Sequence, residues 1–217
     1  MTEPHSTLQK LYPHLSTDKG LVPELRESIA RKCRDSVDTK QQFFERHADT
    51  LIDMASALAE VFQRGGKLLC MGNGGSSCDA AHLSVEFNHP VTTGRPALPA
   101  INLCADIATL TAVGNDVGFS AIFQRQVMAL GRTGDALFGI STSGDSANLI
   151  DAFAAAHAQG LHTFALLGSD GGALATHPAV EHCLVVNSHS VHRIQETHVT
   201  CYHILWDLVH TLMAERR

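Results

Sequence analysis

Five short apolar runs, separated by segments of helical period, constrain the fold of this chain more than any other feature of its sequence. They read KLLCMG, ALPAINL, DALFGIS, HTFALLG and HCLVVN, and they lie between residues 67 and 187. Apolar runs of this length, with helical segments between them, are typical of parallel strands that are buried on both faces. We therefore expect an α/β fold with three layers, α/β/α, around a five-stranded, mainly parallel sheet.

The part of the chain before these runs predicts a lead-in segment followed by helices. Residues 1–20 include two prolines and show no sustained period, so the lead-in segment of residues 1–23 is expected to be loosely ordered. Apolar positions then recur every three or four residues in VPELRESIARKCRDSVD and in TKQQFFERHADTLIDMASALAEVFQRGG, which predicts two N-terminal helices. Residues 24–217, with these helices included, are expected to form a single domain.

The charge and hydropathy of the chain exclude several classes of partner. Its 217 residues carry a formal net charge of −6 with only 16 Lys and Arg, which form no basic stripe for a nucleic acid. No apolar run approaches the roughly 20 residues of a membrane span, and the N-terminus lacks the basic-then-apolar order of a signal peptide. We expect a soluble, cytoplasmic protein that binds neither nucleic acid nor membranes.

Two polar loops follow the first and the third apolar run. They read GNGGSS and STSGDS, and each leads into a segment of helical period. In an open parallel sheet, ligands bind outside the carboxyl ends of the strands, where loops enter helix N-termini. Because both loops occupy that position, the sequence favours a ligand-binding site at this edge of the sheet.

The loop STSGDS has the chemistry of a site for a small anion. Ser141, Thr142, Ser143 and Ser146 supply hydroxyl groups, and the following helix offers free backbone N–H groups and the positive end of its dipole. Such a turn can hold a phosphate without Lys or Arg, and it suits a phosphorylated small molecule better than a nucleic acid. A serine-rich helix N-cap without a ligand is the alternative, since Ser and Thr favour that position.

The loop GNGGSS resembles other glycine-rich loops only loosely, because it is neither GxGxxG nor a P-loop. Gly72, Gly74 and Gly75 permit a sharp turn and a close approach of a ligand to the backbone. Asn73 and Ser76 can donate or accept hydrogen bonds there. A turn without a ligand stays open as the alternative.

His82 and Glu86 follow the glycine loop and are four residues apart, so on a helix they share one face. An imidazole and a carboxylate on one face can bind a divalent metal, and they can equally form a surface pair. Their position just after the glycine loop, at the ligand end of the sheet, strengthens the interpretation as a metal site, and the surface pair stays open as the alternative.

The segment VHRIQETHVTCYHILWDLVHTLM predicts a last helix with polar side chains in apolar surroundings. Its apolar face includes Ile194, Tyr202, Leu205, Leu208 and Val209. Gln195, His198 and His203 lie on the same helix and need partners if they are buried, from a metal, solvent or the backbone. In a straight helix Gln195 and His203 lie about 12 Å apart along the axis and about 80° around it. They could lean together, belong to two sites or meet residues of another subunit.

Four segments of the chain, in order, resemble the sugar isomerase (SIS) domain family, and within it the phosphoheptose isomerases. They are MGNGGSSCDAAH, LTAVGNDVGF, GDALFGISTSGDSANLI and RIQETHVTCYHILWDLV, and the likeness covers roughly residues 24–217. The resemblance implies a three-layer SIS fold and a homotetramer with active sites between subunits, which the N-terminal helices help to assemble. It also implies one Zn²⁺ per subunit and an aldose–ketose isomerisation through an enediol, from sedoheptulose 7-phosphate to D-glycero-D-manno-heptose 7-phosphate.

The same resemblance implies roles for residues of this chain by their position in the motifs. The implied zinc ligands are His82, Glu86, Gln195 and His203. Glu86 is implied as the base that removes a carbon-bound proton, and His203 as the acid that protonates the neighbouring oxygen. A carboxylate in a shielded site and an imidazole suit proton transfer near neutral pH. The implied substrate-binding residues are Asn73, Gly74, Ser76, Asp116, Ser141, Thr142, Ser143, Ser146 and Gln195.

Two positions depart from the pattern of the phosphoheptose isomerases. Pro90 stands where they usually have an arginine, and His192 stands where they tend to have an aspartate. Both positions lie near the sugar in that family, so an isomerase for a different sugar phosphate is one alternative. A non-catalytic SIS adaptor that binds a protein such as a replication initiator is another. Such adaptors lose the equivalents of Glu86 and His203, which this chain retains.

Overall fold

The structure, a computed structural model, describes residues 21–215 of the chain. The expected lead-in of residues 1–23 lies outside the described residues except for its last part, which begins helix α2 (Leu21–Gln63). In chain order the remaining elements are β1 (Leu68–Gly72), α3 (Gly75–Asn88), β2 (Ala100–Asn102), α4 (Ile107–Asp116), η1 (Phe119–Ala121), α5 (Ile122–Leu130), β3 (Ala136–Ser141), α6 (Ala147–Ala158), β4 (His162–Gly168), η2 (Ala173–Thr176), β5 (His182–Val186) and α7 (Val191–Glu215).

The five predicted strands form one sheet in the order β2-β1-β3-β4-β5, and every neighbouring pair is parallel. The prediction of an α/β fold on a five-stranded parallel sheet is therefore confirmed. All residues of β1 and β3 are buried, which explains why both strands are continuous apolar runs and do not alternate with polar residues.

The prediction of two N-terminal helices is wrong, because α2 is one helix of 43 residues. The expected boundary falls between Asp38 and Thr39, which are common at helix ends. No glycine or proline occurs between Pro23 and Gly65, however, so nothing in this stretch prevents the backbone from continuing as a helix. Among the described residues, no helix has both the length and the apolar character needed to cross a bilayer.

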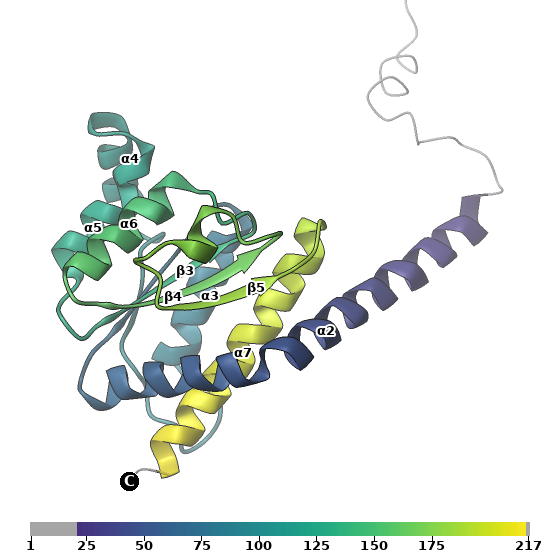
Figure 1. Cartoon of the computed structure of the whole chain (residues 1–217), viewed down its shortest axis with the longest axis horizontal. Coiled ribbons are helices and arrows are strands. Elements are labelled where there is room, and N and C mark those ends of the chain that lie inside the picture. The colour runs from purple at the N-terminus through teal and green to yellow at the C-terminus, as the bar shows by residue number, and fades with distance from the viewer. Residues whose placement is uncertain (1–20, 216–217) are drawn as a thin grey trace, which may run out of the picture. The chain divides into compact units, whose positions relative to one another are not determined.

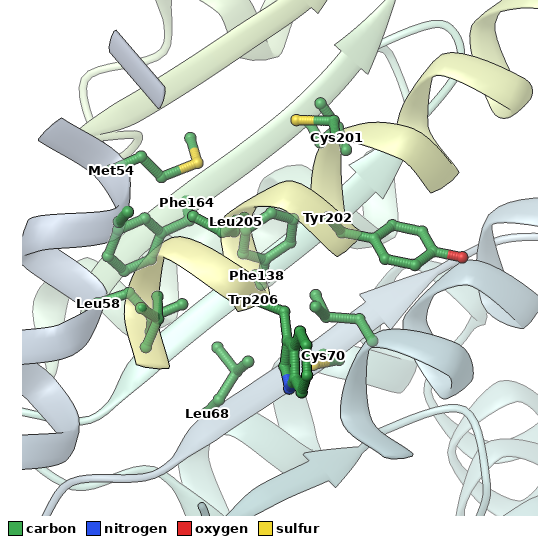
Figure 2. Packing of buried hydrophobic residues seen from close by; sticks show 14 of the residues in the cluster. Met54, Leu58, Leu68, Cys70, Phe138, Phe164, Cys201, Tyr202, Leu205 and Trp206 are labelled. Atoms are coloured by element: carbon green, nitrogen blue, oxygen red, sulfur yellow. The ribbon is translucent and has the colours of Figure 1, made fainter. Parts of the chain in front are cut away.

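Helices lie on both sides of the sheet (Figure 1). A separate hydrophobic core lies on each face of the sheet. On β1, Leu68 and Cys70 point into the core that also contains α3, α7 and the second half of α2, whereas Leu69 and Met71 point into the core formed with α5 and α6. Figure 2 shows part of the first core, with side chains of α2, α7 and the strands in contact. Helices therefore cover both faces of the sheet, as the three-layer prediction requires.

The strand order creates a switch point between β1 and β3, since the chain leaves β1 for one edge strand and later strands are added on the other side. Gly72, the last residue of β1, is paired with Ile140, the next-to-last residue of β3. The loops GNGGSS and STSGDS consequently start side by side. This is where open α/β sheets bind their ligands.

His198 is a buried polar side chain on α7 with a partner in the backbone. It is fully buried, and its Nε2 lies 3.0 Å from the carbonyl oxygen of Leu167, to which it donates as a neutral imidazole. Its Nδ1 has no hydrogen-bond partner. Burial lowers the pKa of His198 to about 4, despite the opposing effect of the Leu167 carbonyl. The sequence left a metal, solvent or the backbone open as the partner of His198, and the structure shows a backbone carbonyl group.

Because the pKa of His198 is lower in the folded protein than the ordinary value, folding stability should fall between about pH 6.5 and pH 4. The neutral form is stable in the core, and the unfolded chain takes up the proton first. We expect acidification from pH 7 to pH 5 to cost the wild type about 2 kcal/mol more of unfolding free energy than His198→Gln, which keeps a donor for Leu167.

Urea unfolding of both proteins at several pH values measures this difference. Asp79, whose pKa is raised to about 6, acts in the opposite direction, but it is present in both proteins and cancels in the comparison. An identical pH dependence of wild type and variant would contradict the expectation.

Candidate functional site

One part of the candidate site lies where helix α7 packs along helix α3. The two helices run in the same direction, because Tyr202 contacts His82, and Trp206, one turn further along α7, contacts Glu86, one turn further along α3. The indole N–H of Trp206 donates to the carbonyl oxygen of Glu86 at 2.8 Å. These contacts fix the register in which side chains of α3 and α7 meet.

His82, Glu86 and His203 converge at this contact between the helices. His82 Nε2 lies 3.1 Å from Glu86 Oε1 and 3.4 Å from His203 Nε2, and His203 Nε2 lies 3.9 Å from Glu86 Oε1. The side chain of Glu86 is 18% exposed, whereas those of His82 and His203 are each 42% exposed. The cluster is therefore shielded on the side of the carboxylate and open to a ligand on the side of the imidazoles.

The donor set and its spacing fit a divalent metal ion. Among the described residues, His82, Glu86 and His203 form a group whose ligand atoms all lie within 4.8 Å of one another. A tetrahedral zinc ion with bonds of about 2.0–2.1 Å spaces its ligand atoms about 3.3 Å apart, close to the separations in this cluster. Two imidazoles and a carboxylate are also a set that catalytic zinc uses, with a further position for water or substrate.

The surroundings of His203 lower its pKa. Burial, together with the neighbouring His82, lowers the pKa of His203, and the carboxylate of Glu86 acts in the opposite direction. A lower pKa favours the neutral imidazole at neutral pH. The neutral imidazole is the form that binds a metal.

Gln195 lies beside the glycine loop. Its amide packs against Gly75, so closely that a Cβ at Gly75 would overlap Gln195 Nε2. From Gly75 to His82 is two turns of α3, which is about 10 Å along the helix axis. Within this chain, Gln195 therefore lies at the start of α3, whereas His203 lies at the cluster with His82 and Glu86. The side chains of Gln195 and His203 do not lean together.

Sequence reasoning missed two polar groups behind His82. The hydroxyl oxygen of Tyr202 lies 2.8 Å from His82 Nδ1, and the carboxyl group of Asp79 is close to both residues. Burial raises the pKa of Asp79 to about 6, against the effects of His82 and Tyr202. Asp79 precedes His82 by one helical turn, and this spacing is the signal that could have indicated a shared face. Tyr202 reads in the sequence only as a member of an apolar face.

The other part of the candidate site is the turn between β3 and α6. Ser141 is buried, and its hydroxyl oxygen accepts a hydrogen bond from the Gly144 N–H at 3.0 Å. Ser143 Oγ accepts from the Asp145 N–H at 3.3 Å. Ser146 is the N-cap residue of α6, but its side chain forms no capping hydrogen bond. The alternative of a serine side chain that caps the helix is thus not realised at Ser146. Thr142 is half-buried and Ser143 is exposed.

The loop after β1 is joined to this turn by a pair of amide groups. Asn73 Nδ2 donates to Asn148 Oδ1, and Asn148 Nδ2 donates to Asn73 Oδ1, both at 2.9 Å. In the same loop Gly74 has φ 54°, and Ser76 is buried at the start of α3. Asn73 therefore links the glycine loop to the first turn of α6.

Three further positions lie outside these two groups. Asp116 is exposed at the end of α4, and its carboxylate accepts a hydrogen bond from Asn115 Nδ2 at 2.8 Å. In the hydrogen bonds of residues 21–215 it is not linked to the loops or to the cluster on α3. Pro90 is half-buried just beyond the end of α3, and His192 is exposed in the first turn of α7.

The protein has a parallel α/β sheet, polar loops at the switch point of that sheet, and a His–Glu–His cluster beside them. These features place it in a class of α/β proteins with a ligand site at the carboxyl ends of the strands. Residues 33–168 match the family model described as the SIS domain. The chain belongs to the SIS domain family.

Within that family, phosphoheptose isomerases are among the similar proteins with curated names. One from Roseiflexus sp. (strain RS-1) is 45% identical over 180 residues, which cover 83% of this chain and 90% of that protein. One from Thermodesulfovibrio yellowstonii is 42% identical over 192 residues, which cover 88% and 94%. The resemblance to phosphoheptose isomerases in the four motifs is thereby confirmed.

Solved structures agree with these relatives. A phosphoheptose isomerase from Neisseria gonorrhoeae superposes with a TM-score of 0.80 at 38% identity, covering 86% of this chain and 99% of that chain. One from Francisella tularensis superposes with a TM-score of 0.81 at 37% identity, covering 85% and 97%. The prediction of the SIS fold is therefore confirmed.

Proposed function

We propose that this chain is a phosphoheptose isomerase, which converts sedoheptulose 7-phosphate to D-glycero-D-manno-heptose 7-phosphate through an enediol. The observation that carries the proposal is the convergence of His82, Glu86 and His203. It occurs in a chain that is similar to phosphoheptose isomerases over most of their length. A base and an acid held within a few ångströms are what an aldose–ketose isomerisation needs.

In the proposed reaction Glu86 removes the proton from the carbon next to the carbonyl group, and His203 protonates the carbonyl oxygen, which yields the enediol. The enediol then loses a proton from its other hydroxyl group and regains the carbon-bound proton at the former carbonyl carbon. Partial shielding of Glu86 supports this role, because a base in a water-poor site is more reactive. The imidazole of His203 can both give and take a proton near neutral pH.

The phosphate group is proposed to bind at the turn between β3 and α6 and at the glycine loop. Ser141, Thr142, Ser143 and Ser146 supply hydroxyl groups, and the N-terminus of α6 supplies backbone donors. Asn73, Gly74, Ser76, Gln195 and Asp116 are proposed to complete the substrate site. The position of Gln195 supports its inclusion in this site, since it is a residue of α7 whose amide group lies against Gly75 in the glycine loop.

We propose one Zn²⁺ per subunit, held by His82, Glu86 and His203. Gln195 is proposed as a further ligand that reaches the ion from a neighbouring subunit, since Gln195 of the same chain packs against Gly75. When bound, the ion would polarise the carbonyl oxygen of the sugar and stabilise the negative charge that develops on it. The donor set and the spacing of the ligand atoms support this assignment.

A homotetramer with active sites between subunits is also proposed. Apolar side chains at Val22, Leu25, Ile29 and Val37 are exposed along one part of α2. Ile107, Val117 and Phe119 are exposed around α4. Contiguous exposed apolar side chains are characteristic of surfaces that another chain covers. A second copy of this chain is the proposed occupant, and sedimentation at micromolar concentration measures the number of subunits.

Comparing turnover of sugar phosphates with five, six and seven carbons tests the proposed substrate. We expect the zinc-loaded protein to isomerise sedoheptulose 7-phosphate with the highest kcat/KM in the set. Turnover of a shorter ketose phosphate alone would show that the chain acts on a different sugar phosphate, which is the alternative suggested by Pro90 and His192. Absence of turnover on every sugar would favour an adaptor that binds a protein partner.

A further inference from the structure

The turn between β3 and α6 packs against the segment that follows β4, the β4 loop of residues 169–174 (SDGGAL). β3 and β4 are neighbouring parallel strands, so the turn and the β4 loop leave the sheet at the same edge. The Leu174 N–H donates to the carbonyl oxygen of Gly144 at 3.0 Å, and the Ala173 N–H donates to Asp145 Oδ1 at 2.8 Å. A side chain of the turn is therefore a direct partner of the β4 loop.

Asp145 is the one charged side chain in a turn that otherwise offers neutral donors to an anion. A carboxylate repels a phosphate group, so its presence in this turn needs an explanation. Asp145 is exposed, and packing does not require a carboxylate there. A carboxylate accepts hydrogen bonds more strongly than a neutral oxygen does. The hydrogen bond from the Ala173 N–H, which joins the turn to the β4 loop, therefore explains the acidic side chain.

The backbone of the β4 loop is shaped to fit the turn. Ser169 has φ 59° and, of the residues that the structure describes, is the only non-glycine residue with a positive φ. Such strain persists where the surrounding structure requires it, often at functional sites. Gly172 has φ 53°, and a Cβ there would lie 2.4 Å from the Ser143 carbonyl oxygen and 2.5 Å from Asp145 Oδ1. The β4 loop therefore lies directly against the turn.

The conformation of the turn decides where its hydroxyl groups lie. Ser141 Oγ accepts from the Gly144 N–H, and Ser143 Oγ accepts from the Asp145 N–H. A hydroxyl group that accepts in this way can still donate its own hydrogen to an oxygen of a ligand. Gly144 and Asp145 are also the residues of the turn that bond to the β4 loop. A shift of these two residues would therefore move both hydroxyl groups.

We propose that Asp145 is a positioning residue for the phosphate group of the substrate, and that it acts by holding the turn between β3 and α6 against the β4 loop. The carboxylate binds the Ala173 N–H, while the hydroxyl groups of the turn and the N-terminus of α6 bind the phosphate group. A turn that is already in place binds more tightly, because less conformational freedom is lost on binding. The inference rests on the proposed function in treating this turn as the phosphate site.

A phosphorylated probe that cannot be isomerised tests this role by binding alone. The probe is the alditol phosphate made by reducing the carbonyl group of sedoheptulose 7-phosphate, and titration calorimetry measures its affinity. We expect Asp145→Ala to bind it about 10-fold more weakly than the wild type, the effect of losing one hydrogen bond to a charged group. Asp145→Asn is the matched control, because its side-chain oxygen can still accept from the Ala173 N–H without the charge. We expect its affinity to equal or exceed that of the wild type.

Two further measurements locate the effect. Inorganic phosphate, used as a competitor of the alditol phosphate, contacts only the phosphate site. We expect its affinity to fall in Asp145→Ala by the same factor as that of the alditol phosphate. Amide hydrogen exchange at Ala173 reports the hydrogen bond to Asp145 without any ligand. We expect slow exchange in the wild type and in Asp145→Asn, and faster exchange in Asp145→Ala.

Equal affinities of wild type and Asp145→Ala for the alditol phosphate, or unchanged exchange at Ala173, would overturn the proposal. An Asp145→Asn variant that binds as weakly as Asp145→Ala would do the same, because the hydrogen-bond acceptor would then not be what matters. A wild type that binds neither phosphate compound would overturn the proposed phosphate site and the role of Asp145 with it. A wild type that binds the alditol phosphate but isomerises no sugar would contradict only the proposed reaction, and the affinities of the variants would still decide the role of Asp145.

Discussion

Glu86→Gln is expected to lower kcat for isomerisation by about 10²- to 10⁴-fold, the range that general acid–base catalysis contributes. Glutamine has nearly the shape of glutamate, but its amide cannot accept the proton from carbon. The backbone carbonyl of residue 86, which accepts from the Trp206 indole, is unaffected by the change. The contact between α3 and α7 should therefore remain, and thermal unfolding should be close to that of the wild type.

Steady-state kinetics on sedoheptulose 7-phosphate at saturating Zn²⁺ measure the effect. Glu181→Gln is the matched control, because Glu181 is exposed on another part of the chain and pairs with His162. We expect the control to retain wild-type kcat. Activity in Glu86→Gln within a few-fold of the wild type would remove Glu86 as the base.

Gly144→Ala is expected to have the largest effect on stability, a loss of about 2–5 kcal/mol of unfolding free energy from backbone strain and overpacking together. Gly144 has φ 72°, in the left-handed region, and a Cβ there would overlap the carbonyl oxygen of Gly171. That oxygen belongs to the backbone and cannot rotate away. The turn that carries Ser141 and Ser143 would have to move.

Gly65→Ala is the matched control for Gly144→Ala. Gly65 has a similar φ of 83°, but a Cβ there meets no atom within 4 Å. It should therefore cost only the strain of the left-handed backbone, about 1–2 kcal/mol. Urea unfolding of both variants separates strain from overlap. Equal losses in the two variants would show that the contact with Gly171 is unimportant.

The strands were predictable from the sequence because each is an apolar run, and such a run can be identified from its own residues without knowing what it packs against. The run DALFGIS differs from β3 (Ala136–Ser141) by one residue, and HTFALLG coincides with β4 (His162–Gly168). The end of a helix is harder to predict, as α2 shows. Residues such as Asp38 and Thr39 favour a helix end, yet they also fit a helix interior when no glycine or proline interrupts it.

The candidate site was predictable where its geometry lies within one element. His82 and Glu86 share a face of α3 because of their spacing, and the two loops meet because they follow neighbouring parallel strands. The partners of His82 on α7 depend on how α7 packs against α3. No periodicity in the sequence specifies that Tyr202 meets His82 while Gln195 meets Gly75. Those contacts required the structure.

Isomer exchange in D₂O tests most directly whether the cluster on α3 and α7 transfers protons. Zinc-loaded wild type is incubated with sedoheptulose 7-phosphate, and both sugars are recovered for NMR and mass spectrometry. The account predicts deuterium at the carbon next to the carbonyl group in wild-type samples, and none above background with Glu86→Gln. Interconversion without deuterium in either sugar, or equal incorporation with Glu86→Gln, would contradict it.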